Sequence, residues 1–138
     1  MAKKIPKKYT ARLSRKDKRK QTRKIKQSIR AYRRGVYIDR PKLKSYHPRR
    51  SQWVVKFEKQ YGSDIKTYAQ IEQVTGIPKK ALQEVVKKGR GAYYSSGSRP
   101  NQTATSWGKA RMYSYIMGGP TRKYDEHITK KYNVIFKD

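Results

Sequence analysis

Apolar residues recur along most of the chain at the spacing of amphipathic helices, and this pattern predicts a mainly α-helical protein. The first such segment lies between Ser14, a favourable helix N-cap, and Gly35, a favourable residue after a helix C-terminus. Its narrow apolar stripe consists of Ile25, Ile29, Tyr32 and Val36. Because the stripe covers only the second half, we expect the first half to be a solvated basic helix.

Further helices are predicted after Ser51, with glycines at positions 62, 76 and 89 ending the first three. The second of these is expected to be capped by residue 63 or 64, and Pro78 suits the first turn of the third. A fourth helix should open at residue 105 or 106, and Asp125 should cap a short helix over residues 126–131. The tail at 132–136 is expected to form a strand or simply to pack. The residues predicted to form the core are Trp53, Phe57, Ile71, Leu82, Val85, Trp107 and Met117.

These elements predict a small multi-helix body with a long basic N-terminal extension. Residues 1–50 should form a basic arm, a helix and an extended connector, because Pro6, Pro41 and Pro48 disfavour helix around them. Residues 51–138 should form the compact helical body. Between about 89 and 104, a segment rich in glycine and serine predicts an ordered loop that joins two helices.

Net charge adds a functional expectation to this outline. The chain has 37 Lys and Arg against nine Asp and Glu, for a formal charge of +28. Such self-repulsion destabilises a compact free monomer, so we expect the protein to work beside a counter-charge. Nucleic acid bound without sequence specificity is the first candidate; an acidic protein shell or an anionic membrane surface comes second. The residues expected to contact a polyanion are Lys16, Lys18, Arg19, Lys20, Arg23, Lys24, Arg33, Arg34, Lys79, Lys80, Lys87, Lys88, Arg90 and Arg99.

Other residue types are too few or too scattered to predict a metal site, a cofactor or a membrane span. The absence of cysteine excludes disulfides, thiol catalysis and cysteine-ligated zinc. His47 and His127 have no cluster of carboxylates near them in the sequence, so we expect no metal site. No apolar run reaches the roughly 20 residues that a membrane-spanning helix needs.

Residues 69–89, AQIEQVTGIPKKALQEVVKKG, have the outline of a helix-turn-helix. In such motifs the second helix enters the major groove, and here that helix carries four of the lysines named above. Two helices joined by a short turn are also an ordinary way to build a small core. We prefer this second interpretation and keep the first as an alternative.

The segment KKGRGAYYSSGSRP, residues 87–100, invites comparison with enzyme loops. It does not match a phosphate-binding loop, because five residues separate Gly91 from Gly97 and no Lys-Ser/Thr follows. It also lacks the second glycine of a G-x-S-x-G nucleophile turn. Ser96, His127 and Asp125 supply the residue types of a catalytic triad, but nothing in the sequence orients them. We therefore expect no catalytic residue and no enzyme, and keep an enzyme acting at this loop as a remote alternative.

Two other roles suit the same loop. Its glycines would let backbone N–H groups converge on an anion, with Arg90 and Arg99 as further donors. Alternatively, Tyr93, Tyr94 and Trp107 pack the loop down as a rigid brace, and the two roles are compatible. Tyrosines between basic residues could also stack on bases of single strands, but their helical spacing favours a place between core and solvent.

Three stretches carry a family likeness: RPKLKS, TGIPKKALQEVVKKGRGAYYSSGSRPNQTATSWGKARMYSYIMGG and TRKYDEHI. They resemble an uncharacterised domain in proteins of large nucleocytoplasmic DNA viruses, including algal viruses such as chloroviruses. The likeness covers about residues 40–128. It implies a viral protein carried in the particle, and it brings no established activity.

A viral context suits two roles for a small basic protein. We expect a non-enzymatic minor capsid protein on the inner face of the shell, with its arm bound to neighbouring capsid proteins and to the genome. The alternative is a virion protein that binds and condenses DNA. The corresponding location is the capsid interior, and the host cytoplasm or nucleus during assembly.

Overall fold

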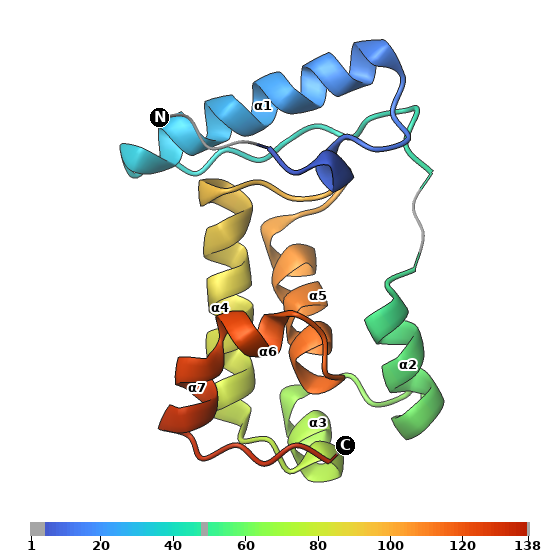
Figure 1. Ribbon diagram of the computed structural model, residues 1–138, viewed down its shortest axis with the longest axis vertical. Helices are drawn as coiled ribbons and strands as arrows, with labels where there is room; N and C mark the ends of the chain where they lie inside the picture. The colour runs from blue at the N-terminus through green and yellow to red at the C-terminus, as the bar shows by residue number, and fades with distance from the viewer. Residues whose placement is uncertain (1–4, 48–49, 138) are drawn as a thin grey trace. The chain divides into compact units, whose positions relative to one another are not determined.

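The computed structural model describes residues 5–47 and 50–137, and the regular elements of those residues are all helices (Figure 1). The prediction of a mainly α-helical, multi-helix protein is therefore confirmed. The elements are the 3-10 helix η1 (Lys7–Tyr9) and the α-helices α1 (Arg15–Arg33), α2 (Gln52–Tyr61), α3 (Tyr68–Thr75), α4 (Lys79–Ser95), α5 (Ala104–Ile116), α6 (Thr121–Tyr124) and α7 (Glu126–Lys131).

The chain divides into two compact units. Unit 1 combines the described residues before 50 with Arg90–Trp107, and unit 2 combines Arg50–Gly89 with the described residues from Gly108 onward. The division expected from the sequence placed 1–50 apart from 51–138. The structure differs in that residues 90–107 cluster with the N-terminal segment rather than with the remaining helices.

Helix α1 begins where the sequence predicts, because the Ser14 hydroxyl accepts a hydrogen bond from the backbone N–H of Asp17 at 3.1 Å. Gly35, which follows the C-terminal cap residue, has a φ of +77°. The buried face of the helix consists of Gln21, Ile25, Ser28 and Ala31. The predicted apolar stripe is therefore wrong in part: Ile25 is buried, but Val36 is 49% exposed.

The core of unit 2 is a single cluster of buried side chains. Its members are Phe57, Ile71, Ile77, Ala81, Leu82, Val85, Val86, Met112, Tyr115, Ile116, Ile128 and Val134. Four of the seven residues predicted for the core are among them, and Met117 packs against the cluster. Trp53 is only half-buried. Trp107 lies in unit 1, where its ring packs edge-on against that of Tyr9, with ring centres 5.8 Å apart. The tail packs through Val134 and forms no strand among the described residues.

Side-chain caps fix two helix starts that the sequence placed differently. Helix α3 begins after Thr67, not after residue 63 or 64, because Thr67 and Gln70 cap each other's backbone N–H groups at 3.0 and 3.1 Å. Helix α5 begins after Thr103, whose hydroxyl accepts from the N–H of Ser106 while the Ser106 hydroxyl accepts from the N–H of Thr103. Reciprocal pairs of this kind define a start more sharply than a single polar residue.

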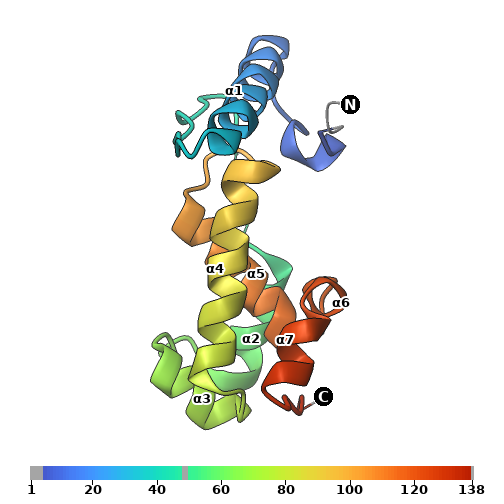
Figure 2. The ribbon, with the colours of Figure 1, turned by 90° about the vertical axis from the view of Figure 1, so that its left-hand side faces the viewer.

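Helix α4 is longer than expected, since it continues unbroken past Gly89 to Ser95 (Figure 2). Gly89 is buried, and a Cβ placed on it would lie 2.6 Å from the Cα of Gly108 on α5. The glycine therefore allows α4 and α5 to approach closely within unit 2, and it does not end the helix. The loop predicted over 89–104 is reduced to residues 96–103.

Candidate nucleic-acid interface

A groove of about 480 Å³ lies against α1 in unit 1. Its lining residues are Thr10, Lys18, Arg19, Thr22, Arg23, Lys26 and Arg30. The lining holds five positive side chains, two hydroxyl groups and no carboxylate. We call it the α1 groove. Cations and hydroxyl groups in this combination are the side-chain partners that phosphate oxygens find in nucleic-acid complexes.

Two of the groove's cations, Lys26 and Arg30, were not among the residues predicted to contact a polyanion. A signal for them was present in the sequence, because positions 19, 23, 26 and 30 are separated by four, three and four residues. That spacing places them on one face of a helix. Of the cations predicted on α1, Lys18, Arg19 and Arg23 line the groove.

The remaining cations predicted near α1 lie outside the groove: Lys16, Lys20, Lys24, Arg33 and Arg34. Asp17 is the one acid of this helix, and its carboxylate accepts hydrogen bonds from the hydroxyl and backbone N–H of Ser45 at 2.5 and 3.1 Å. These two hydrogen bonds lower the pKa of Asp17. The carboxylate of Asp17 is therefore hydrogen-bonded to Ser45, in the segment that follows α1.

The buried face of α1 is tied to the 96–103 loop and its surroundings by polar side chains. The Gln21 amide donates to the backbone carbonyls of residues 9 and 98, both at 3.3 Å, and the Ser28 hydroxyl donates to the carbonyl of residue 94. Gly97 has a φ of +100°, and a Cβ there would lie 2.9 Å from Ile25. These contacts hold α1 in place and leave its basic residues outward.

Arg40 is a structural cation and not one of the connector's surface charges. Its guanidinium donates to the Ser28 hydroxyl at 3.2 Å, to the Tyr93 carbonyl at 3.0 Å and to the Ser98 hydroxyl at 2.9 Å. It also lies 3.8 Å from the centre of the Tyr93 ring. Burial lowers the pKa of Arg40 below its ordinary value. The connector is thus fixed to α1 and to the end of α4 through one side chain.

The glycine-rich segment contributes to the structure of unit 1 more than to an anion site. Residues 89–95 are helical, so Gly91 lies within α4 and not in a loop, and the side chains of Arg90 and Arg99 are both exposed. Tyr93 is 1% exposed, and its hydroxyl accepts from the N–H of Arg40 at 3.2 Å. The side chain of Asn101 accepts from the N–H of Leu43 at 2.7 Å and donates to its carbonyl at 3.3 Å. These contacts match the brace interpretation.

A second basic surface lies on α4 within unit 2. The four lysines predicted there, at positions 79, 80, 87 and 88, are all exposed, and the opposite side of the helix buries Leu82 and Val85. The turn before α4 is closed by Gly76 in the left-handed conformation and by Glu72, whose carboxylate accepts from the N–H of Lys79 at 2.7 Å. The helix-turn-helix outline is therefore present, and so is the core role of both helices.

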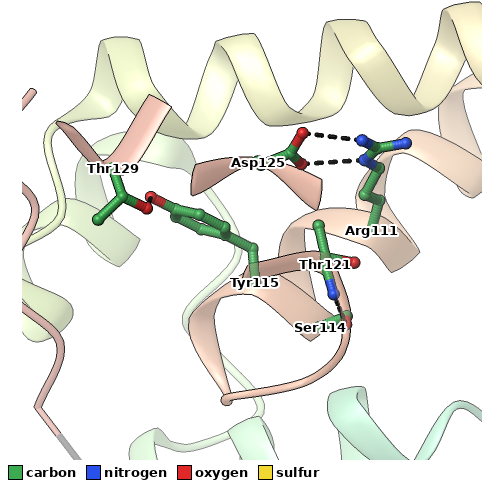
Figure 3. A network of polar contacts seen from close by, with 6 residues as sticks. All are labelled: Arg111, Ser114, Tyr115, Thr121, Asp125 and Thr129. Atoms are coloured by element: carbon green, nitrogen blue, oxygen red, sulfur yellow. Dashed lines mark hydrogen bonds and ion pairs between the residues drawn. The ribbon is translucent and has the colours of Figure 1, made fainter. Parts of the chain in front are cut away.

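A polar network in unit 2 accounts for Asp125 (Figure 3). Both of its carboxylate oxygens accept from the Arg111 guanidinium, at 2.8 and 3.0 Å, and Asp125 is fully buried. Figure 3 also shows the Tyr115 and Thr129 hydroxyls paired at 2.7 Å. His127 is exposed. The carboxylate considered for a catalytic triad thus serves α5 and the start of α7 as an ion-pair partner.

Residues 5–47 and 50–137 contain no group of three or more His, Cys, Asp or Glu arranged to hold a metal ion. Over the same residues, no helix combines the length and the apolar character needed to cross a lipid bilayer.

Comparison with known proteins places the chain in a family. Searches of curated proteins and of solved structures gave no match. The sequence profile of a family of unknown function, DUF5824, matches residues 6–133. This range extends beyond the likeness expected over 40–128 and includes α1 with its groove. The chain belongs to the family of unknown function DUF5824.

Proposed function

We propose that this protein binds nucleic acid through the α1 groove and is not an enzyme. The observation that carries the proposal is the lining of the groove, five cations and two hydroxyl groups without a carboxylate. Contacts of this type hold the phosphate backbone and do not read the base sequence. The bound polymer would also supply the counter-charge that a chain of net charge +28 needs.

The groove has the length for several phosphate contacts. Arg30 lies eleven positions after Arg19, which is about 16 Å along a helix axis at the usual rise per residue. Phosphates of one strand of B-DNA are about 3.4 Å apart along the duplex axis, so about five lie within that length. A protein that neutralises phosphates releases counterions, and its affinity therefore falls steeply with salt.

A titration of duplex DNA at several salt concentrations tests the proposal. The groove variant carries Arg19→Gln, Arg23→Gln and Lys26→Gln. The control variant also removes three positive charges, but from exposed positions of unit 2: Lys59→Gln, Lys66→Gln and Lys123→Gln. Each lost phosphate contact should reduce the slope of log affinity against log salt by about 1, so the groove variant should lose about 2–3. The control should lose less than about 1 by the same reasoning.

Two results would reject the proposal. One is a wild-type affinity that does not change with salt. The other is an equal loss of slope in the groove and control variants, since only the total charge would then matter. Thermal unfolding of both variants checks that the groove variant keeps the native structure.

The second candidate is the minor capsid protein expected from the resemblance to proteins of large DNA viruses. It is favoured by exposed apolar side chains of unit 2, which suit contacts with other proteins: Val55, Tyr124 and Ile135. We rank it second because residues 5–47 pack with residues 90–107 of the same chain and do not form an arm free to run between neighbours.

Cross-linking and mass spectrometry of purified virus particles test the capsid role. The expected cross-links join this chain to capsid proteins on the inner face of the shell. Recovery of the chain only with the genome would favour DNA condensation in the virion, and its absence from particles would remove both viral roles.

A further inference from the structure

We propose that three tyrosines of unit 1, Tyr32, Tyr37 and Tyr94, bind an unstacked base of single-stranded nucleic acid. We call them the tyrosine cluster. The inference rests on the proposed function and deepens it, because it names the strand state that the protein prefers. It assigns to these residues a role beyond packing between core and solvent.

The cluster combines ring contacts with exposure. The ring centres of Tyr37 and Tyr94 are 5.1 Å apart, those of Tyr32 and Tyr37 5.7 Å, and those of Tyr32 and Tyr94 6.4 Å. Tyr37 nevertheless is 66% exposed, far more than a tyrosine that only fills space between core and surface. An exposed ring held by two others offers a face on which a base can stack, and stacking does not depend on base identity.

The cluster has a rigid support. The Tyr94 ring packs edge-on against the ring of Tyr93, with centres 5.0 Å apart, and Tyr93 is buried under the guanidinium of Arg40. Burial and the nearby carboxylate of Asp39 raise the pKa of Tyr94, which favours the uncharged phenol. A preorganised platform of this kind loses little conformational entropy when a ligand binds.

Space and charge beside the cluster suit a nucleotide. A hollow of about 270 Å³ is lined by Ile29, Tyr32, Arg33 and Ser95, and therefore combines an apolar wall, a ring and a cation. Arg33 lies three residues after Arg30 of the α1 groove, about one helical turn along α1. A strand whose phosphates follow the groove would thus arrive at the tyrosines.

One acid lies at the cluster and limits the path of the strand. Asp39 accepts a hydrogen bond of 3.5 Å from the Tyr94 hydroxyl. Its charge repels phosphate, so the backbone should pass on the side of Arg33 and Arg34, both exposed at the end of α1. The attraction from these cations and the repulsion from Asp39 give the strand one favoured course.

Fluorescence anisotropy with the full chain tests the inference, using three labelled probes of equal length: oligo-dT, the same backbone with abasic sites, and duplex DNA. Tyr37→Leu removes the ring and keeps an apolar side chain. Tyr124→Leu is the matched control, because Tyr124 is 69% exposed and lies in unit 2. Tyr37→Trp keeps a stacking ring.

Tyr37→Leu should bind oligo-dT at least about fivefold more weakly than the wild type does, because it loses one stacked base. Fivefold corresponds to the lower end of the free energies measured for stacking of one base on an aromatic ring. Binding of the abasic probe and of duplex DNA should change less than about twofold, because phosphate contacts carry them. Tyr37→Trp should retain oligo-dT binding, and Tyr124→Leu should match the wild type.

The outcomes separate this inference from the proposed function. If the wild type binds neither oligo-dT nor duplex, the proposed function fails. The stacking inference is wrong if both probes bind but Tyr37→Leu weakens the binding of oligo-dT and of the abasic probe equally. It is also wrong if Tyr37→Leu weakens oligo-dT binding no more than Tyr124→Leu does. In either case the proposed binding at the α1 groove is unaffected. Weakened oligo-dT binding by Tyr37→Trp would also overturn it.

Discussion

Alanine at Gly89 and alanine at Gly91 should change stability in opposite directions, although both glycines lie inside α4. At either position alanine gains about 1 kcal/mol of helix propensity over glycine. The difference lies in the space around each Cβ. At Gly91 the nearest atom is the Tyr32 hydroxyl oxygen at 3.9 Å, an ordinary van der Waals contact. At Gly89 the Cβ would meet the Cα of Gly108 at 2.6 Å.

The contact at Gly89 involves backbone, so no side-chain rotation relieves it. The helices α4 and α5 would have to separate in the core of unit 2, and overpacking of this kind costs about 3 kcal/mol at the upper end of the usual range. After the gain in helix propensity, Gly89→Ala should lower the free energy of unfolding by about 2 kcal/mol. Gly91→Ala should raise it by about 0.5–1 kcal/mol.

Thermal and urea unfolding, followed by far-UV circular dichroism, measure both effects. At about 4 °C per kcal/mol for a chain of this size, Tm should fall by about 8 °C for Gly89→Ala and rise by about 3 °C for Gly91→Ala. The urea m-value should stay constant, which shows that only stability changed. If Gly89→Ala is as stable as the wild type, then α4 and α5 do not cross closely there and the explanation for the unbroken helix is wrong.

Two further predictions concern ionised groups. Asp125→Asn leaves the Arg111 guanidinium without its anionic partner and should lower the free energy of unfolding in urea by about 2–4 kcal/mol. For Asp17, whose pKa is lowered by Ser45, the stabilising contribution is present above the unfolded pKa of about 4 and is lost as pH falls through the lowered native value. Ser45→Ala should therefore lose less stability than the wild type between about pH 5 and pH 2 in urea unfolding.

Each of these has a result that contradicts it. An Asp125→Asn variant as stable as the wild type would mean that the ion pair only offsets the cost of its own burial. Parallel acid profiles of wild type and Ser45→Ala would mean that the hydrogen bond from the Ser45 hydroxyl does not favour the carboxylate of Asp17. Asp39→Asn is the control for the second experiment, because it removes another carboxylate of the same segment and leaves the Ser45–Asp17 hydrogen bonds in place.

Local signals in the sequence were sufficient for most of the helices. Ser14 and Ser51 cap α1 and α2 as predicted, and Gly62 and Gly76 follow the ends of α2 and α3. These features depend on a side chain and the backbone within a few residues, so they can be recognised without the fold. The spacing of cations on α1 is equally local, so the cations of the α1 groove could have been assigned from the sequence, whereas Thr10 reaches the groove only through the fold.

The polar residues that became part of the interior could not be recognised in this way. Gln21 and Ser28 interrupt the apolar pattern of α1, yet they lie on its buried face because carbonyls of distant segments accept their hydrogen bonds. From the sequence, Arg40 is indistinguishable from an exposed basic residue. In the fold, the Ser28 and Ser98 hydroxyls and the Tyr93 ring surround its guanidinium. Burial of a polar group is favourable only where partners exist, and those partners come from other parts of the chain.

The sequence by itself determined the helical class of this protein, most of its helix ends and its net charge of +28. Tertiary structure alone decided that residues 90–107 pack with the N-terminal segment and that Gly89 lies inside a helix. The physical reason is the sequence separation of the residues that interact. Helix caps and helical periodicity depend on residues that are neighbours in the chain, and net charge depends on composition alone. Close backbone approach and buried hydrogen bonds depend on residues that only folding brings together.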